Sequence, residues 1–246
     1  MKCVNATWEL RNLGVNTIEL EVEKNDAAEK ILKEIENYRR QYDAKYVVVK
    51  SNTRYPEISL PLQYAGFLLI ENQIGLKLTR EDALKALGEY NEFFDEISYK
   101  LADEAEMKMI FSEIARGIFT TDRIALDPKF GVEIANQRYS FWIKDALSRG
   151  AYVFLSLYEN TPIGFFMAKT TEPKKSDGLL GGLFNRPEAY HKGIFHLIAG
   201  HKCFCDGGGN IDRTFVSSNN LNVLRIHLLL GRKVTGIRNV FVKHYD

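Results

Sequence analysis

The fold is decided by one stretch of the chain, in which a strand is followed by a tight turn and a helix. It reads Leu-Leu-Gly-Gly-Leu-Phe-Asn over 179–185 and Tyr-His-Lys-Gly-Ile-Phe over 190–195. A helix that begins straight after a loop has amides without partners and partial positive charge at that end, so phosphates bind there. Gly193 lets a ligand approach the backbone closely, and His191 and Lys192 can add charge. The stretch predicts an anion site, with an ordinary strand-to-helix loop and a solvated basic turn as the alternative.

The segment that follows has a distinctive order of elements. A strand-like run over 211–218 is followed by Asn219 and Asn220, an apolar helix over 223–230, Gly231 and a final alternating stretch. Asn favours the position that caps a helix N-terminus, so Asn220 is expected to begin this helix.

Together these segments resemble the GNAT superfamily of N-acetyltransferases. The acetyl-coenzyme A loop of that family carries R/Q-x-x-G-x-G/A, and its next helix runs N-x-x-A-x-x-x-Y-x-x-x-G-F. On this chain the first pattern falls on Tyr190, Gly193 and Phe195, and the second on Asn220, Val223, His227, Gly231 and Arg232. Gly193, Asn220 and Gly231 keep the family letters, so the resemblance depends on element order and spacing as much as on identities.

Two further stretches extend the resemblance over most of the chain. Residues 122–130 and 138–144 look like the segment that precedes the core in bacterial TDP-fucosamine acetyltransferases. Residues 62–67, with the alternating strand after them, are similar to the small domain that those enzymes carry ahead of the core. The resemblance implies an α/β (α+β) fold with a mixed, mostly antiparallel central sheet flanked by helices. It also implies a small N-terminal α/β domain over 1–80, a helical connection over 81–112 and a GNAT-like acetyltransferase domain over 113–246.

The family's cofactor site maps onto the strand, loop and helix start. Acetyl-coenzyme A is the implied cosubstrate, with pantetheine along the backbone of 179–185 and pyrophosphate at the helix start. The residues predicted to bind it are Leu183, Phe184, Tyr190, His191, Lys192, Gly193, Ile194, Phe195 and Asn220. Phe195 stands where the family has a small residue, and we expect its ring to point into the core.

His227 occupies the position of the family's tyrosine, which protonates the departing thiolate. No Tyr lies between Asn220 and Gly231. With a reference pKa of about 6.5, an imidazolium can protonate a thiolate of pKa about 8.5, although protonation at neutral pH limits it. His227 is therefore the predicted catalytic acid, and a packing histidine is the alternative.

The acceptor site is expected in the segment before the core. Asp122, Arg123 and Asp127 are the predicted substrate-binding residues, while Tyr139 and Trp142 lie at helical spacing and fit the core better. A water relayed to Glu159 or Asp122 is one route for the amine proton, and nothing in the sequence selects a general base.

Composition limits the partners. The 246 residues include 33 basic and 32 acidic side chains and 45% hydrophobic residues, which suffices for a sizeable core but offers no basic face for nucleic acid. No run of 18 apolar residues and no apolar leader occurs, so we expect a cytoplasmic protein that does not bind membranes. Three cysteines without CxxC spacing, and histidines without acidic partners at ligand spacing, predict no disulfide framework and no metal.

Periodicity predicts the remaining elements. Residues 17–22 and 46–49 read as parallel strands around a helix over 28–42, which Asp26 and Glu29 can cap. Residues 81–116 read as one charged helix, 152–157 and 163–168 as a hairpin, and 170–177 as a polar turn. The order strand, helix, Gly, strand, turn, strand over 46–78 is repeated over 214–245, which suggests a half-copy of the core or a coincidence.

The sequence therefore predicts an acetyl-coenzyme A dependent N-acetyltransferase acting on a small primary amine, with a nucleotide-linked amino sugar as the favoured acceptor. A peptide, an aminoglycoside or a polyamine is the enzymatic alternative. A degenerate acyl-coenzyme A binding module without catalysis is the alternative from another class. A homodimer is the family's habit.

Overall fold

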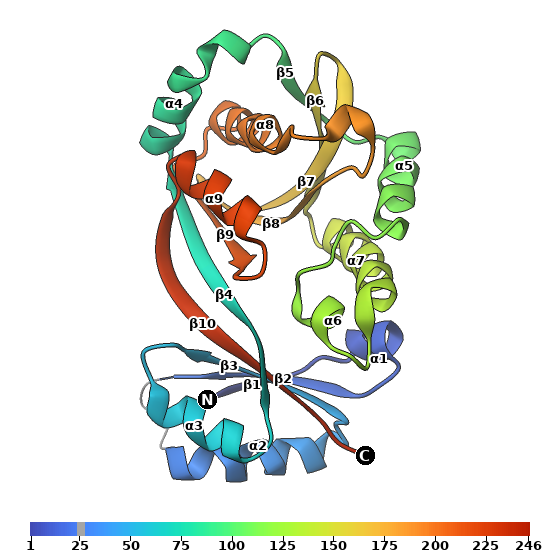
Figure 1. Cartoon of the computed structure of the whole chain (residues 1–246), viewed down its shortest axis with the longest axis vertical. Helices are drawn as coiled ribbons and strands as arrows, with labels where there is room; N and C mark the ends of the chain where they lie inside the picture. The colour runs from blue at the N-terminus through green and yellow to red at the C-terminus, as the bar shows by residue number, and fades with distance from the viewer. Residues whose placement is uncertain (24–27) are drawn as a thin grey trace.

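A ten-stranded sheet forms the centre of the molecule. The computed structural model describes residues 1–23 and 28–246, so the predicted cap at Asp26 lies outside the described residues. The strand order is β1-β2-β3-β10-β4-β9-β8-β7-β6-β5, and only the β2/β3 and β8/β9 pairs are parallel. This mixed, mostly antiparallel sheet with helices on both sides confirms the predicted fold class (Figure 1).

The elements follow one another in a βαβ-rich order. Up to the middle of the chain they are β1 (Lys2–Asn5), α1 (Trp8–Leu13), β2 (Thr17–Val22), α2 (Ala28–Gln41), β3 (Tyr46–Asn52), α3 (Pro56–Tyr64), β4 (Leu68–Thr79), α4 (Arg80–Glu89), η1 (Asn91–Phe93), β5 (Ile97–Leu101) and α5 (Glu104–Ala115). From there they are α6 (Arg123–Leu126), α7 (Gly131–Ser148), β6 (Tyr152–Tyr158), β7 (Thr161–Glu172), β8 (Lys175–Leu183), η2 (Pro187–Ala189), α8 (Gly193–Asp206), β9 (Ile211–Ser217), α9 (Leu221–Leu229) and β10 (Lys233–His244).

Two layers of helices cover the sheet. Helices α1, α5, α6 and α7 pack on one side, named here the α7 face, around clusters that include Tyr46 and Phe165. Helices α2, α3, α4, α8 and α9 pack on the other side, the α8 face, around clusters that include Leu20, Leu76 and Ile198. Apolar side chains alternate between these faces along the strands, so each layer buries its own core.

The sheet has an internal twofold pattern. The series β1, β2, α2, β3, α3, β4 (first repeat, 2–79) recurs as β7, β8, α8, β9, α9, β10 (second repeat, 161–244). The strand order from β1 to β7 reads the same from either end when these partners are exchanged, and the pairing directions agree at every step. The predicted echo between the two segments therefore corresponds to a structural repeat.

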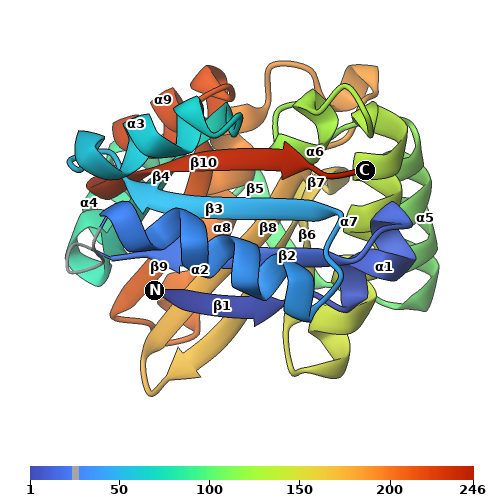
Figure 2. The ribbon, with the colours of Figure 1, turned by 90° about the horizontal axis from the view of Figure 1, so that it is seen from below.

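The two repeats exchange their last strands. β4 of the first repeat pairs with β9, and β10 of the second repeat pairs with β3, so β4 and β10 lie next to each other in the middle of the sheet. Figure 1 shows these two long strands crossing from one end of the molecule to the other, and Figure 2 shows β10 lying against β3. At the crossing, Asn72 Nδ2 donates to Asn239 Oδ1 at 2.7 Å, over a separation of 167 residues.

Several local predictions are confirmed. The predicted strands over 17–22 and 46–49 are β2 and β3, and they pair in parallel. The predicted hairpin is β6 and β7, whose turn residues Glu159 and Asn160 have φ values of 47° and 62°. Positive φ at both positions is what a two-residue hairpin turn requires.

Other local predictions are wrong. The expected long helix over 81–116 is divided into α4, η1, β5 and α5, because Ile97–Leu101 pairs with β6 and a capping box of Asp103 and Glu106 starts a new helix. The expected turn over 170–177 is mostly strand, with β7 running to Glu172 and β8 starting at Lys175. A strand, a turn and a second strand were expected after the helix in each of the two similar segments. In the structure each of these regions is one continuous strand, β4 in the first segment and β10 in the second.

Candidate functional site

The strands β8 and β9 separate soon after they start to pair. Their parallel register covers only Lys175–Asp177 against Ile211–Arg213. The Thr214 hydroxyl then donates to the Gly178 carbonyl at 2.8 Å, and no pair of residues is in register beyond that point. On its other side β8 stays paired with β7 as far as Leu183. The backbone groups of 179–183 that face β9 are therefore not paired with it, and the region between the two strands beyond Asp177 is named here the opening.

Helix α8 starts at the end of this opening. It begins at Gly193, as predicted, and its first backbone hydrogen bond runs from the His196 amide to the Lys192 carbonyl at 3.0 Å. The amides of Gly193, Ile194 and Phe195 precede that bond, and the Lys192 side chain does not cap them. Such an end combines free donors with partial positive charge and suits an anion.

Two side chains pack closely beside this helix start. A Cβ on residue 193 would lie 2.9 Å from Ile226 Cδ1 of α9 and 3.7 Å from Leu183 Cδ1. Both distances place α9 and the end of β8 against the helix start. A side chain at position 193 would therefore press on the end of the Ile226 side chain and stand beside the amides of the helix start.

The aromatic ring of Phe195 is partly buried and packs against the core cluster that includes Ile198, as expected. It stacks on Tyr158 with ring centroids 4.7 Å apart and an angle of 9° between the planes. The Lys192 ammonium lies 3.7 Å from the centroid of the same Tyr158 ring, so this charge is held on the ring by a cation–π contact. Tyr190 and His191 are exposed, and His191 adopts a left-handed φ of 63°.

Two other residues predicted to bind the cofactor make contacts within the protein. The Phe184 amide donates to the Ile163 carbonyl at 2.9 Å and its ring is buried, so only its carbonyl remains available. Asn220 caps α9 as predicted, with Oδ1 accepting from the Val223 amide at 3.4 Å. The cap uses the side-chain oxygen alone.

His227 lies on α9 with 7% of its surface exposed. Burial lowers the pKa of His227 well below 6.5, and the charge of Arg232 lowers it further. The ring is therefore neutral at pH 7, whereas the predicted role as acid needs an imidazolium. That role stays a prediction, and the surroundings of the ring oppose it.

The predicted acceptor residues divide into two groups. The Arg123 guanidinium is buried and makes ion pairs with Glu19 and Glu9 of the first repeat. Asp127 is buried as well, and accepts from His244 Nε2 at 2.8 Å. Both side chains therefore have partners inside the protein, those of Arg123 in the first repeat and that of Asp127 on β10 of the second repeat.

Asp122 remains open to a role at the site. It caps α6 by accepting from the Ala125 amide at 3.0 Å, and its charge raises the pKa of Tyr139, which burial also raises. The charged groups near Asp122 include one carboxyl that the sequence did not single out.

That carboxyl belongs to Glu71 on β4, which is 5% exposed. Burial raises the pKa of Glu71, the Asp122 charge raises it further, and a hydrogen bond with Ser217 and the charge of Arg123 lower it. Gln73 Nε2 donates to Glu71 Oε1 at 3.3 Å. A carboxyl with a raised pKa is a better proton acceptor near neutral pH than an ordinary one.

The loop before α6 joins Glu71 to the opening. A Cβ on Gly182 of β8 would lie 3.1 Å from Ile118 Cδ1 and 3.4 Å from Phe119 Cε1. At the other end of the loop, Ser217 Oγ of β9 donates to the Thr121 carbonyl at 2.9 Å. The loop thus spans from β8 to β9 on the α7 face, where Glu71 contacts Ser217.

Comparison with known proteins identifies the class of fold. No family model and no curated protein matches the sequence. Among solved structures, the chain is similar to a GCN5-related N-acetyltransferase from Kribbella flavida, with a TM-score of 0.58, 12% identity and coverage of 94% of this chain and 82% of that one. The structure therefore has the fold of the GCN5-related N-acetyltransferases.

Two other solved structures share this arrangement. A conserved protein of unknown function from Staphylococcus epidermidis has a TM-score of 0.64 at 11% identity, with coverage of 94% and 85%. A tandem GNAT protein from the clavulanic acid biosynthesis pathway has a TM-score of 0.55 at 11% identity, with coverage of 93% and 75%.

Within 1–23 and 28–246, no helix is both long and apolar enough to cross a membrane. The same residues contain no group of three or more His, Cys, Asp or Glu placed to hold a metal ion.

Proposed function

We propose that this chain is an N-acetyltransferase that transfers the acetyl group of acetyl-coenzyme A to a primary amine of a small molecule. The observation that carries the proposal is the separation of β8 and β9 beside an uncapped helix N-terminus. Released strand amides suit the amides of pantetheine, and the first amides of α8 suit a pyrophosphate. The fold of the GCN5-related N-acetyltransferases supports the same activity.

The two substrates approach from opposite faces of the sheet. The α8 N-terminus is on the α8 face, while Glu71 and the loop with Phe119 and Asp122 are on the α7 face. The opening between β8 and β9 connects them, so an amine on the α7 face can meet a thioester that enters from the α8 face. Holding both in one opening supplies the orientation that a bimolecular acyl transfer needs.

Glu71 is the proposed general base. The amine nitrogen forms a bond to the acetyl carbon, the bond from that carbon to sulfur breaks, and Glu71 takes the proton that the amine loses. The thiolate that leaves has a pKa of about 8.5 and takes a proton from water or from the protonated Glu71. This scheme does not depend on an imidazolium at His227.

The favoured acceptor is a nucleotide-linked amino sugar, as the sequence resemblance implies, with Asp122 as its proposed contact. A peptide, an aminoglycoside or a polyamine is the alternative acceptor. The cytoplasmic location and the homodimer remain predictions.

A binding module without catalysis is the second candidate function. It is favoured by one observation, the neutral ring of His227 at the family's acid position. Such a module would hold acetyl-coenzyme A in the same opening and release no thiol.

Calorimetric titration with acetyl-coenzyme A, followed by a thiol-release assay on a panel of amines, tests the proposal. We expect one molecule bound per chain, because β2 and β3 of the first repeat stay paired from Thr17 to Val22 and form no second opening. Thiol release with at least one amine would support the enzyme. Binding without release would support the module, and an absence of binding would overturn both.

A further inference from the structure

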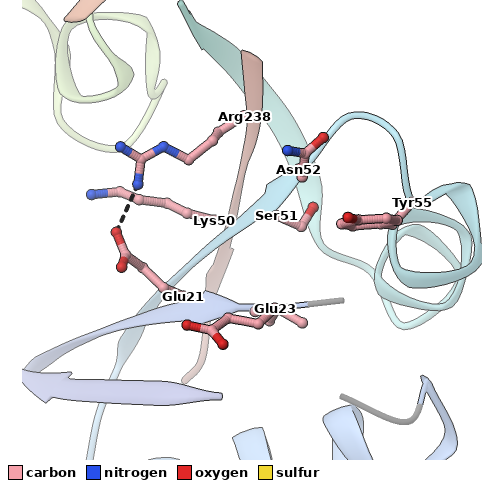
Figure 3. Close-up of a pocket in the computed structure, with 8 residues that line it drawn as sticks. Glu21, Glu23, Lys50, Ser51, Asn52, Tyr55 and Arg238 are labelled. Carbon is pink, nitrogen blue, oxygen red and sulfur yellow. Dashed lines mark hydrogen bonds and ion pairs between the residues drawn. The ribbon is translucent and has the colours of Figure 1, made fainter. Parts of the chain in front are cut away.

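The first repeat contains a cavity at the position that corresponds to the opening in the second. It has a volume of about 280 Å³ and lies at the carboxyl ends of the parallel strands β2 and β3. Its lining includes Glu21, Glu23, Lys50, Ser51, Tyr55 and Arg238, most of which Figure 3 shows converging on it. In open α/β sheets, ligands bind outside the carboxyl ends of parallel strands.

The cavity is not a second coenzyme A groove. Strands β2 and β3 remain in register up to Val22 and Ser51, so their backbone groups are used in the sheet. A ligand here would therefore be recognised by side chains.

Charged side chains of both signs line the cavity, with the cations on one side and the carboxylates on the other, and the two sides meet where Arg238 pairs with Glu21. The cations Lys50 and Arg238 come from β3 and β10, while the carboxylates Glu21 and Glu23 come from β2 and the residue after it (Figure 3). The described lining residues carry two charges of each sign, and Lys50 is also paired with Glu19, whose Oε2 lies 2.9 Å from its Nζ. A ligand with one charge of either sign would thus meet as much repulsion as attraction, whereas a ligand with both charges can satisfy both groups.

The ion pair at the rim can be exchanged for ligand contacts. Arg238 Nη1 lies 2.8 Å from Glu21 Oε1, and the two side chains keep 31% and 49% of their surface exposed. Pairs this exposed contribute little to stability. The Arg238 guanidinium also lies 4.4 Å from the Phe215 ring centroid, which holds it in place when its carboxylate partner changes.

A buried hydroxyl in the lining lacks a partner. Ser51 is 1% exposed, and its Oγ has no hydrogen-bond partner among the described residues. A buried polar group left in this state costs about 1–3 kcal/mol. The Ser51 side chain lies beside the cavity on the side of Tyr55, away from the cations (Figure 3). A polar atom of a ligand could form the missing hydrogen bond with its hydroxyl.

We propose that this cavity binds the zwitterionic head group of a free amino acid, with the carboxylate on Arg238 and the ammonium on Glu21 in exchange for their mutual ion pair. The proposal does not depend on acetyl transfer, since the cavity and the opening between β8 and β9 have different linings.

Calorimetric titration of the protein with amino acids, in the absence of acetyl-coenzyme A, tests whether the cavity binds them. The probes are glycine, L-serine, L-glutamate and L-lysine, with acetate and methylamine as ligands that carry a single charge, all at one ionic strength. We expect at least one amino acid to bind at least ten times more tightly than either acetate or methylamine. If none of the four does so, the proposal is overturned.

Variants of the lining residues test whether the amino acid binds in this cavity. Arg238→Gln and Glu21→Gln should each weaken the best amino acid at least tenfold, while Arg11→Gln, which breaks the exposed Arg11–Asp145 pair on another surface, should leave its affinity unchanged. Thermal unfolding of each variant checks that it is folded. Unchanged affinity in a folded Arg238→Gln variant would contradict the site.

Discussion

At the scale of single residues, the proposed reaction depends most on Glu71 as the general base. Its carboxyl is buried beside Asp122, which makes the ionised form less favourable and raises its pKa. An acid of this kind binds and releases protons nearer to neutral pH.

We expect Glu71→Gln to lower kcat/KM for the amine by about 10²- to 10⁴-fold, the usual contribution of a general base. The wild-type rate should rise with pH through the raised pKa of Glu71, because only the ionised carboxyl accepts a proton, and the variant should lose this rise. Thiol-release rates across pH measure both. Glu172→Gln, at an exposed turn, is the matched control. A variant that keeps half of the wild-type rate would remove Glu71 from the mechanism.

Buried histidines connect stability to pH. Burial lowers the pKa of both His196 and His201 to about 4, and His196 Nδ1 lies 2.7 Å from the Ser156 hydroxyl. Below about pH 6.5 these rings are protonated in the unfolded chain and stay neutral in the folded one. Unfolding then takes up protons, so stability is complete above about pH 6.5 and falls as the pH drops toward 4.

We expect His196→Gln to make the pH dependence of unfolding shallower by about 1.4 kcal/mol per pH unit in this window, which is the effect of one proton. Urea unfolding from pH 7.5 to 4.5 measures the slope. His191→Gln changes the same residue type at an exposed position and should leave the slope as it is. Equal slopes in wild type and His196→Gln would show that the His196 ring does not titrate differently on folding.

Sequence patterns predicted some of these residues and not others. Gly193 and Asn220 stand out locally, because a helix start and a cap depend on neighbours within a few residues. Arg123 and Asp127 looked equally open to a ligand, although each is hydrogen-bonded to a partner more than 100 residues away. Glu71 could not be selected for the same reason, since its neighbours Ser217 and Asp122 come from other parts of the chain.

At the scale of elements, helix α8 contains two glycines with different surroundings. Gly193 begins the helix against Ile226, whereas a Cβ on Gly200 would meet nothing within 4 Å. A Cβ at position 193 would press on the Ile226 side chain beside the helix start, while a Cβ at position 200 would only raise helix stability.

We expect Gly193→Ala to raise the dissociation constant for acetyl-coenzyme A about tenfold or more, the equivalent of one lost hydrogen bond to a charged group. Gly200→Ala should leave that constant unchanged and stabilise the protein by about 0.5–1 kcal/mol. Calorimetric titration and urea unfolding measure these effects. Equal affinity in the two variants would argue against a phosphate at the α8 N-terminus.

Periodicity predicted elements well where one pattern dominates. Thr17–Val22 and the helix after it were expected because their apolar spacing is unambiguous. The 81–116 segment failed because Ile97 and Leu101, four residues apart, fit one helix face, while pairing with β6 makes them a strand. Tertiary pairing overrides local spacing in short segments.

At the scale of the whole molecule, the exchanged strands join the two repeats into one sheet. Val240 of β10 is fully buried and pairs with Lys50 of β3 on one side and Glu71 of β4 on the other. Neither repeat can lose its exchanged strand without exposing the edge of the other.

We expect one cooperative thermal transition, with equal calorimetric and van't Hoff enthalpies. Val240→Ala should lower the free energy of unfolding by about 2 kcal/mol and leave the transition single. Val234→Ala, exposed on the same strand, should change it by less than about 0.5 kcal/mol. Two resolved transitions in differential scanning calorimetry would contradict this coupling.

The repeat itself could be suspected from the sequence, since Gly66 and Gly231 each follow a short helix and precede a long strand. The exchange of the last strands could not be predicted. A hydrophobic pattern indicates that a segment forms a strand, but it does not indicate which strand it pairs with.

The crossing at Asn72 and Asn239 also bears on how the chain is made. A ribosome produces β3 and β4 long before β10, so both strands wait with open edges while the intervening chain is translated. Such edges attract other chains. We expect slow maturation and dependence on chaperones during synthesis, in a protein whose finished sheet shields those same edges.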